Sequence, residues 1–313
     1  MADYIKNMKN IAVIGAGLMG HGIAQIFAVQ GYSVSLVDLN DELLSKALQD
    51  VRSNLTLMAQ KGIGHLDGIE PAIARIKTTV DLSEAATGAQ FVVEAVNEDL
   101  GLKQKIFKKL DAICPKEVIL ATNTSVISIT EIAEKAKIGE RILGTHFWNP
   151  PYLIPLVEVI RGQDTSTEAV DTTFELLKGV GKHPVRVNKD VPGFVGNRLQ
   201  HALWREAISI VERGIADPAT VDECIRFGFG LRLPVLGPLE TADMVGTDLT
   251  LAIHDYILKY IESSPEPSPL LKMKVEKGDL GFKTGRGFQE WSPEEAQRSR
   301  TRLKEYLLKV TKS

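Results

Sequence analysis

Apolar and polar positions alternate between residues 10 and 187 in short blocks that predict strands and helices in turn. Short apolar runs rich in β-branched residues predict buried strands at 11–14, 32–37, 76–80, 91–96, 118–122, 142–147, 156–160 and 184–187. Apolar residues at helical spacing predict helices at 23–28, 41–61, 81–86, 102–113, 129–136 and 165–179. This alternation is typical of a parallel sheet with helices on both faces.

The pattern changes near Lys189, where Pro192 and Gly193 interrupt the chain and the predicted strands stop. Long helical stripes follow, with apolar positions within 199–211, 249–260 and 303–310. We therefore expect an α/β domain over residues 1–188 and a smaller all-helical domain over 189–313. The helical domain has more apolar surface than its own length can cover, so we expect a homodimer.

A glycine pattern follows the first predicted strand directly. Gly15 allows a tight turn, Gly17 lets the backbone approach a pyrophosphate, and Gly20 lets the next helix pack closely on the strand. The N-terminus of that helix offers free N–H groups to an anion. Strand, glycines, helix and second strand occur in the order that a dinucleotide-binding unit requires. The alternative interpretation is a glycine-rich turn that binds no ligand.

Asp38 ends the second predicted strand, at the spacing expected for the carboxylate that accepts the ribose hydroxyls of NAD. A carboxylate repels a 2′-phosphate, and the next residues, Leu39 and Asn40, supply no arginine to bind one. The motif therefore favours NAD over NADP, with FAD as the main competing ligand.

Composition excludes several other classes of function. The 313 residues carry a net charge of −3, and the basic cluster within 298–304 alternates with polar residues, so we expect no nucleic-acid partner. No apolar run reaches membrane-spanning length, and the first residues show no secretion or transit pattern. The two cysteines, Cys114 and Cys224, belong to no ligand motif. We expect a cytoplasmic enzyme without a metal site.

His146 and Glu158 are the strongest candidates for chemistry. His146 ends one apolar strand, and Glu158 lies within the next apolar segment, where an unpaired carboxylate would be costly to bury. A histidine held by a carboxylate is a general base suited to taking a proton from an alcohol. The alternatives are a structural histidine and an acid that faces water.

Two further polar residues occupy positions where a helix cap is the alternative role. Ser125 follows Asn123 and Thr124 at a strand end, and Asn197 starts the first long helix of the C-terminal half. The remaining histidines lack comparable settings, and we expect them to be structural or solvated; they are His21, His65, His183, His201 and His254.

Eight segments together resemble the 3-hydroxyacyl-CoA dehydrogenase family over nearly the whole chain: GAGLMGHGIAQ, VVEAV, ATNTS, HFWNPP, LVEVI, DVPGFVGNRL, GPLETAD and GFKTGRGF. The resemblance implies a Rossmann-like doubly wound domain followed by a helical dimerising domain. It also implies NAD-dependent oxidation of a 3-hydroxyl to a 3-oxo group, most simply on a 3-hydroxyacyl-CoA in fatty acid metabolism.

The family's functional residues fall on positions of this chain that match its motifs. The resemblance implies that His146 is the catalytic base, that Glu158 orients it, and that Ser125 and Asn197 hold the substrate oxygen. We expect NAD to be held by Gly15, Gly17, Leu18, Met19, Gly20, Asp38, Glu98, Lys103, Asn123, Asn149 and Lys283. The two contacts to the CoA nucleotide would fall on Asn54 and Lys61.

Two departures from the family pattern keep other substrates open. The run from Asn149 through Pro150 and Pro151 is similar to relatives that act on free hydroxy acids, such as gulonate 3-dehydrogenase, and on hydroxymethyl-pyridine carboxylates. The helix before Lys61 is poor in lysine, whereas a CoA 3′-phosphate favours positive charge. A dehydrogenase of a non-CoA hydroxy acid and a non-catalytic, crystallin-like NAD binder are therefore the alternatives.

Overall fold

A computed structural model describes residues 7–63 and 68–311, and the chain divides into two compact units. One unit holds the residues up to Asn197 together with those from Lys304 onward, and the other holds Arg198–Leu303. The division lies beyond residue 188, and the end of the C-terminal helix belongs to the N-terminal unit. His65 lies outside the described residues.

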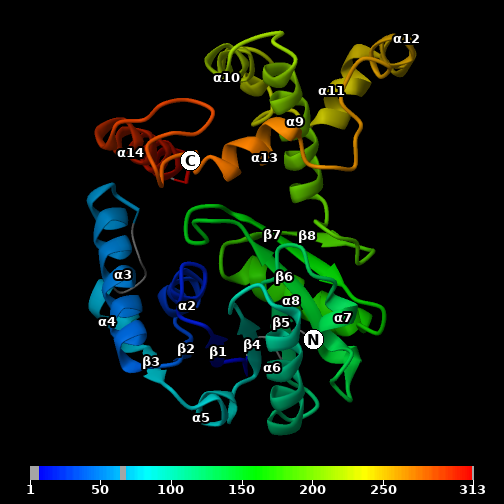
Figure 1. The fold of residues 1–313 in the computed structure, drawn as a ribbon. Helices are drawn as coiled ribbons and strands as arrows, with labels where there is room; N and C mark the ends of the chain where they lie inside the picture. The colour runs from blue at the N-terminus through cyan, green and yellow to red at the C-terminus, as the bar shows by residue number, and fades with distance from the viewer. Residues whose placement is uncertain (1–6, 64–67, 312–313) are drawn as a thin grey trace. The chain divides into compact units, whose positions relative to one another are not determined.

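Within the described residues, the N-terminal unit contains an eight-stranded sheet in the order β3-β2-β1-β4-β5-β6-β7-β8 (Figure 1). The strands are β1 (Asn10–Ile14), β2 (Ser33–Val37), β3 (Ile76–Thr79), β4 (Phe91–Glu94), β5 (Ile119–Thr122), β6 (Ile142–Phe147), β7 (Leu156–Arg161) and β8 (His183–Val187). The strand order reverses direction between β1 and β4. In open α/β sheets, this switch point is where dinucleotides bind.

Helices cover both faces of the sheet because alternate strand residues point to opposite sides. Ile11 and Val13 of β1 pack in one core, and Ala12 and Ile14 pack in the other. The first core is closed by α2 (Gly20–Val29), α3 (Asp41–Gln60), α4 (Ile69–Ala74) and α8 (Thr167–Gly179). The second is closed by α5 (Leu82–Ala86), α6 (Leu100–Ile113) and α7 (Ile129–Ala133). The Rossmann-like architecture is thus confirmed.

One strand pair departs from the expected parallel sheet. Strands β6 and β7 are antiparallel, with His146 opposite Glu158, whereas the other neighbouring strands are parallel. Only residues 148–155 join them, which is too short for the helical crossover that a parallel pair needs. The short connection therefore returns the chain directly and sets these two side chains against each other.

The second unit is helical, as expected. Its elements are the greater part of α9 (Gly196–Glu212), α10 (Pro218–Phe227), the 3₁₀ turn η2 (Phe229–Leu231), α11 (Pro238–Val245), α12 (Thr247–Ile257), α13 (Pro269–Glu276) and the start of α14 (Pro293–Val310). Many of its large apolar side chains are exposed, among them Trp204, Leu249 and Ile253. Among the described residues, no helix has both the length and the apolar character to cross a membrane.

The end of α14 packs within the N-terminal unit. Leu308 is buried beside Met58 of α3 and Leu153 of the β6–β7 connection. The hydroxyl of Thr311 donates a hydrogen bond to the carbonyl oxygen of Leu153 at 3.3 Å. The last apolar stripe of the chain therefore has a partner inside the chain itself, on the loop that follows His146.

Candidate active site

The glycine pattern forms the tight turn between β1 and α2. Gly15 has a φ of +101°, and a Cβ on it would lie 2.7 Å from the carbonyl oxygen of Ala95. A Cβ on Gly20 would lie 1.7 Å from the carbonyl oxygen of Gly15. Only glycine fits either position. A Cβ on Gly17 meets nothing within 4 Å, so this part of the turn borders open space.

Asp38 is tied to this turn. Its Oδ2 accepts a hydrogen bond from the N–H of Ala16 at 2.6 Å, and its Oδ1 accepts one from the N–H of Leu39 at 2.7 Å. The side chain is half-buried at the end of β2. A half-buried carboxylate beside an open glycine turn at a helix N-terminus matches what the adenosine end and pyrophosphate of NAD require. The residues present therefore fit this cofactor.

His146 and Glu158 form a buried pair. The Nδ1 of His146 lies 2.8 Å from Oε2 of Glu158, and the two residues are 4% and 1% exposed. Because a carboxylate only accepts, we assign the proton to Nδ1, which leaves the lone pair on Nε2. Within the described residues, Nε2 has no hydrogen-bond partner. The imidazole therefore has one nitrogen held and one available to take a proton.

The second oxygen of Glu158 holds the start of α9. Its Oε1 accepts hydrogen bonds from the N–H groups of Val195 at 2.9 Å and Gly196 at 3.0 Å. Burial raises the pKa of Glu158, but the hydrogen bonds from His146, Gly196 and Val195 outweigh it and leave that pKa below its ordinary value. The carboxyl group is therefore ionised and can stabilise an imidazolium on His146.

Aromatic rings surround the imidazole. The ring centroids of Trp148 and Phe194 lie 5.3 Å and 5.7 Å from that of His146. Trp148 also packs on Gly196, since a Cβ there would lie 2.4 Å from its Cζ2 atom. The base is thus buried beside two aromatic rings, in surroundings of low polarity that strengthen its bond to Glu158.

Ser125 and Asn197 lie together. The Nδ2 of Asn197 donates to the carbonyl oxygen of Ser125 at 3.0 Å, and the N–H of Ser125 donates to Oε1 of Glu98 at 2.7 Å. The same Glu98 oxygen accepts from the hydroxyl of Thr124 at 2.6 Å and from the N–H of Val126 at 3.1 Å. Glu98 therefore holds residues 124–126 of the loop that follows β5.

Lys103 lies behind this loop. It is fully buried, and its Nζ lies 2.8 Å from Oε1 of Glu94, 3.4 Å from Oε2 of Glu98 and 3.5 Å from the carbonyl oxygen of Val96. Glu94 also accepts from Thr122 and Val96, both at 2.7 Å. The ammonium group is thus enclosed by protein acceptors.

The remaining predicted residues have different surroundings. Asn123 is buried, and its Oδ1 accepts from the N–H of Phe147 at 2.9 Å, next to His146. Asn54 is 7% exposed, with its Nδ2 lying 3.5 Å from Nε2 of His21. Met19 is half-buried against the core. The other predicted contacts are exposed: Leu18, Lys61, Asn149 and Lys283, the last in the helical unit.

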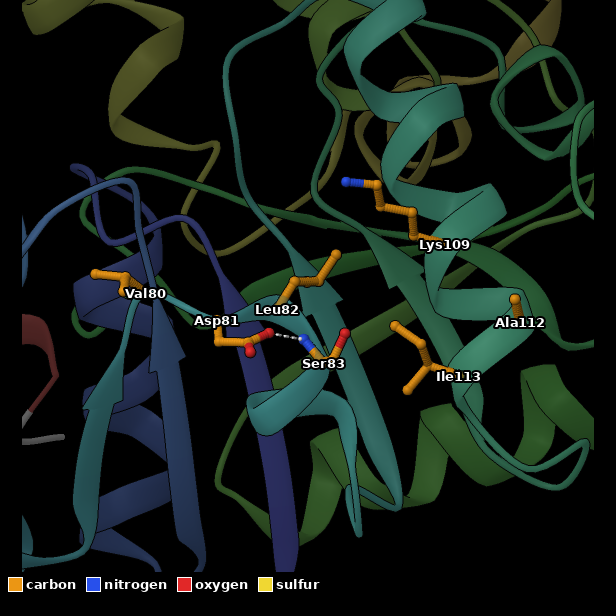
Figure 2. A pocket seen from close by; sticks show the side chains of 7 residues that line it. All are labelled: Val80, Asp81, Leu82, Ser83, Lys109, Ala112 and Ile113. Carbon is orange, nitrogen blue, oxygen red and sulfur yellow. Dashed lines mark hydrogen bonds between the residues drawn. The ribbon is translucent and has the colours of Figure 1, made fainter.

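A separate, open pocket lies in the N-terminal unit between α5 and α6 (Figure 2). Its lining residues are Val80, Asp81, Leu82, Ser83, Lys109, Ala112 and Ile113, none of them a predicted site residue. In Figure 2, Asp81 bonds the N–H of Ser83, which caps α5. This pocket is therefore distinct from the cluster around His146.

Sequence reasoning missed Glu94, whereas it expected His21 to be structural or solvated, and His21 is buried beside the glycine turn. Glu94 lies inside an apolar run, the same signal that identified Glu158, and it anchors Lys103. His21 follows the glycine pattern directly, and its Nδ1 lies 2.9 Å from the carbonyl oxygen of Gly17. Burial lowers the pKa of His21, which favours the neutral ring that supports the turn.

Comparisons with known proteins agree over both units. The model for the 3-hydroxyacyl-CoA dehydrogenase NAD binding domain matches residues 10–191, and the model for the C-terminal domain of that enzyme matches residues 193–291. A probable 3-hydroxybutyryl-CoA dehydrogenase of Bacillus subtilis is 40% identical over 91% of this chain and 98% of its own.

Two solved structures are also similar. The NAD+-dependent dismutase 5-formyl-3-hydroxy-2-methylpyridine 4-carboxylic acid 5-dehydrogenase has a TM-score of 0.90 at 32% identity, over 97% of both chains. The (S)-3-hydroxybutyryl-CoA dehydrogenase of Ralstonia eutropha has a TM-score of 0.77 at 38% identity, over 91% of this chain and 100% of its own.

Proposed function

This chain belongs to the 3-hydroxyacyl-CoA dehydrogenase family of NAD-dependent oxidoreductases, and on that premise we propose that it oxidises a 3-hydroxyl group to a 3-oxo group. The observation that carries the proposal is the buried pair of His146 and Glu158, in which Nε2 is left without a partner in the described chain. We propose His146 as the general base.

Bound NAD would supply the acceptor for the hydride of the alcohol. We propose that the turn from Gly15 to Gly20 holds its pyrophosphate and that Asp38 holds its adenosine ribose. The open space beside Gly17 and the half-buried carboxylate of Asp38 support this assignment. Asn123 and Asn149, at the ends of β5 and β6, are our proposed contacts nearer the reacting atoms.

His146 takes the hydroxyl proton on Nε2 and becomes an imidazolium, which Glu158 stabilises through Nδ1. Glu158 does not need to take the proton itself, because its hydrogen bonds hold its pKa low. We propose that the hydroxyl of Ser125 and the amide of Asn197 hold the substrate oxygen. The hydrogen bond from Nδ2 of Asn197 to the backbone carbonyl oxygen of Ser125 keeps the two residues side by side and supports a joint role.

We propose a 3-hydroxyacyl-CoA as the substrate, in line with the names of the Bacillus subtilis and Ralstonia eutropha relatives. Lys61, exposed at the end of α3, is the proposed contact to the CoA nucleotide. NADH formation with 3-hydroxybutyryl-CoA, followed by the absorbance of NADH, tests this proposal against a panel of free hydroxy acids.

A free hydroxy acid is the second candidate, and a specific observation favours it. Asn54, the other proposed CoA contact, is buried against His21 and is not presented to a nucleotide. The TM-score to the pyridine-carboxylate dehydrogenase also exceeds that to the Ralstonia eutropha enzyme. Turnover of free acids without turnover of the thioester would establish this candidate. Absence of all turnover, with NAD still bound, would favour the non-catalytic binder.

We also propose a homodimer formed through the helical unit. The exposed apolar side chains of α9 and α12, including Leu199, Leu249 and Ile253, support a protein partner there. Sedimentation equilibrium of the whole chain tests this proposal, and a monomer at micromolar concentration would contradict it.

A further inference from the structure

We propose that His21 is a positioning residue for the cofactor: its ring holds the peptide between Gly17 and Leu18 so that the N–H of Leu18 faces the pyrophosphate of NAD. The inference rests on the proposed function, because it concerns the turn to which we assign that pyrophosphate. It gives a role to a buried histidine that the proposed reaction does not use.

The ring of His21 is fixed against the glycine turn. The residue is 6% exposed, and its Nδ1 lies 2.9 Å from the carbonyl oxygen of Gly17. The backbone N–H of His21 also donates to this oxygen, at 3.1 Å. Because a carbonyl oxygen has two lone pairs, His21 supplies a donor for each and fixes the direction of the Gly17 carbonyl group.

The two neighbours of the ring select one tautomer. A carbonyl oxygen only accepts, so we assign the proton of the neutral ring to Nδ1, and Nε2 keeps its lone pair. Nε2 lies 3.5 Å from Nδ2 of Asn54, an amide donor that suits this lone pair. Burial lowers the pKa of His21, which favours the neutral ring. The ring is therefore in the form that donates to Gly17.

The direction of the Gly17 carbonyl group also sets the direction of the Leu18 N–H, because both belong to one planar peptide unit. In a trans peptide these two bonds point in opposite directions. The carbonyl group points to the buried ring of His21, so the N–H points away from it. The turn borders open space here, since a Cβ on Gly17 would meet nothing within 4 Å and Leu18 is 64% exposed. The proposal places this donor on the open side of the turn.

The start of α2 is free to receive an anion. The first N–H groups of a helix have no partner within it. Met19, the residue before α2, makes no capping hydrogen bond with its side chain, and the first turn holds no acidic residue. A pyrophosphate is favoured at such a helix N-terminus. His21 fixes the peptide that leads into this first turn.

The test compares His21→Ala with His21→Ser in the whole chain. Both variants remove the ring and differ by one hydroxyl, and a serine in a helix can donate to the carbonyl oxygen four residues before it. His21→Ala should raise the Kd for NAD about fivefold, and His21→Ser should stay within about twofold of the wild type, as expected for one neutral hydrogen bond. Equal losses in both variants, or no loss in either, would overturn the proposal.

Fragments of the cofactor locate the effect. ADP carries a pyrophosphate, whereas adenosine carries none. The proposal predicts that His21→Ala weakens the binding of ADP by about the same factor as the binding of NAD and leaves the Kd for adenosine unchanged. An equal loss with adenosine would place the effect away from the pyrophosphate and contradict the proposal.

A measurement on the wild type decides even if a variant fails to fold. Nitrogen NMR of the His21 ring at neutral pH should show a neutral ring that carries its proton on Nδ1. A ring protonated on Nε2 alone would have no donor for the carbonyl oxygen of Gly17 and would overturn the proposal.

Binding measured without substrate separates this proposal from the proposed oxidation. If the wild type binds NAD but oxidises no hydroxy compound, the oxidation fails while the comparison of the two variants still stands. Where turnover is found, His21→Ala should raise the KM for NAD and spare kcat at saturating NAD. A fall in kcat with an unchanged KM would contradict a role in cofactor binding.

Discussion

Two buried pairs in the N-terminal unit have the same nitrogen-to-oxygen distance. They differ in whether the basic side chain keeps a polar atom without a hydrogen-bond partner. His146 and Glu158 are 2.8 Å apart, and so are Lys103 and Glu94. In both pairs the carboxylate also accepts from the backbone: Glu158 from the N–H groups of Val195 and Gly196 at the start of α9, and Glu94 from the N–H of Val96. The imidazole, however, keeps one nitrogen without a partner in the described chain, whereas the ammonium is enclosed. The difference teaches that a polar atom left without a hydrogen-bond partner, more than burial or pairing, identifies the side chain that takes part in the reaction.

His146→Gln should give the largest effect. It removes the proton acceptor and leaves the pocket shape, so kcat should fall by at least about 10²-fold, the lower end for a general base. The Kd for NAD and the unfolding midpoint in urea should change little, because Glu158 keeps its two N–H donors. Near-normal turnover in this variant would contradict the role of His146 as the base.

Glu94→Gln should lower the free energy of unfolding without changing the chemistry of turnover. Removing the carboxylate leaves the ammonium of Lys103 buried beside only one acid, and breaking such a pair costs about 3 kcal/mol or more. The urea midpoint should fall accordingly, while the pH dependence of any remaining turnover keeps its wild-type shape. Glu175→Gln, at an exposed position of α8 and outside both pairs, serves as the matched control. A variant as stable as the wild type would show that the lysine pair is not a structural anchor.

Gly196→Ala should disturb the functional pair without touching its charges. The added Cβ would lie 2.4 Å from Cζ2 of Trp148, and Gly196 supplies an N–H to Glu158. Overpacking of this kind costs about 2 kcal/mol. A lower urea midpoint and a lower kcat are expected together. Trp148→Phe in the same chain removes the clashing ring atoms and should recover part of both losses.

The smallest expected effect is the acid sensitivity of the loop held by Glu98. Its pKa lies below the ordinary value in the folded chain, so its contribution to stability is present above the unfolded pKa and is lost as pH falls through the folded pKa. The stability difference between wild type and Glu98→Gln should therefore shrink on acidification below the usual glutamate range. A difference that does not vary with pH would contradict the ion-pair account.

Most elements of the fold could be predicted from the sequence because apolar residues recur in them at the spacing typical of strands or helices. The eight described strands lie close to their predicted positions, and among the helices that the structure describes in the sheet domain only α4 was missed. That helix, Ile69–Ala74, is short and contains Pro71 directly after the glycine-rich stretch, so its sequence resembles a loop. The spacing of apolar residues alone could not predict that β7 runs antiparallel to β6, because this direction depends on the length of the connection between them.

Site residues could be predicted from the sequence where a residue type requires a partner, as an acid in an apolar strand does. They were harder to predict where the partner lies on another kind of element. An acid within an apolar strand must have a partner, and this reasoning found Glu158 beside His146. The same reasoning applies to Glu94, but its partner Lys103 lies on a helix, where its burial leaves no sequence signal. Asn54 was assigned by position in a motif, whereas its environment depends on packing against His21.

The pH dependence of kcat/KM tests the central claim most directly, measured for wild type and His146→Gln with the substrate that the panel identifies. The account predicts that the wild-type value falls at acid pH with the loss of one deprotonated group, and that this acid limb disappears in the variant together with most of the turnover. An unchanged acid limb in His146→Gln, at comparable turnover, would contradict the assignment of His146 as the base.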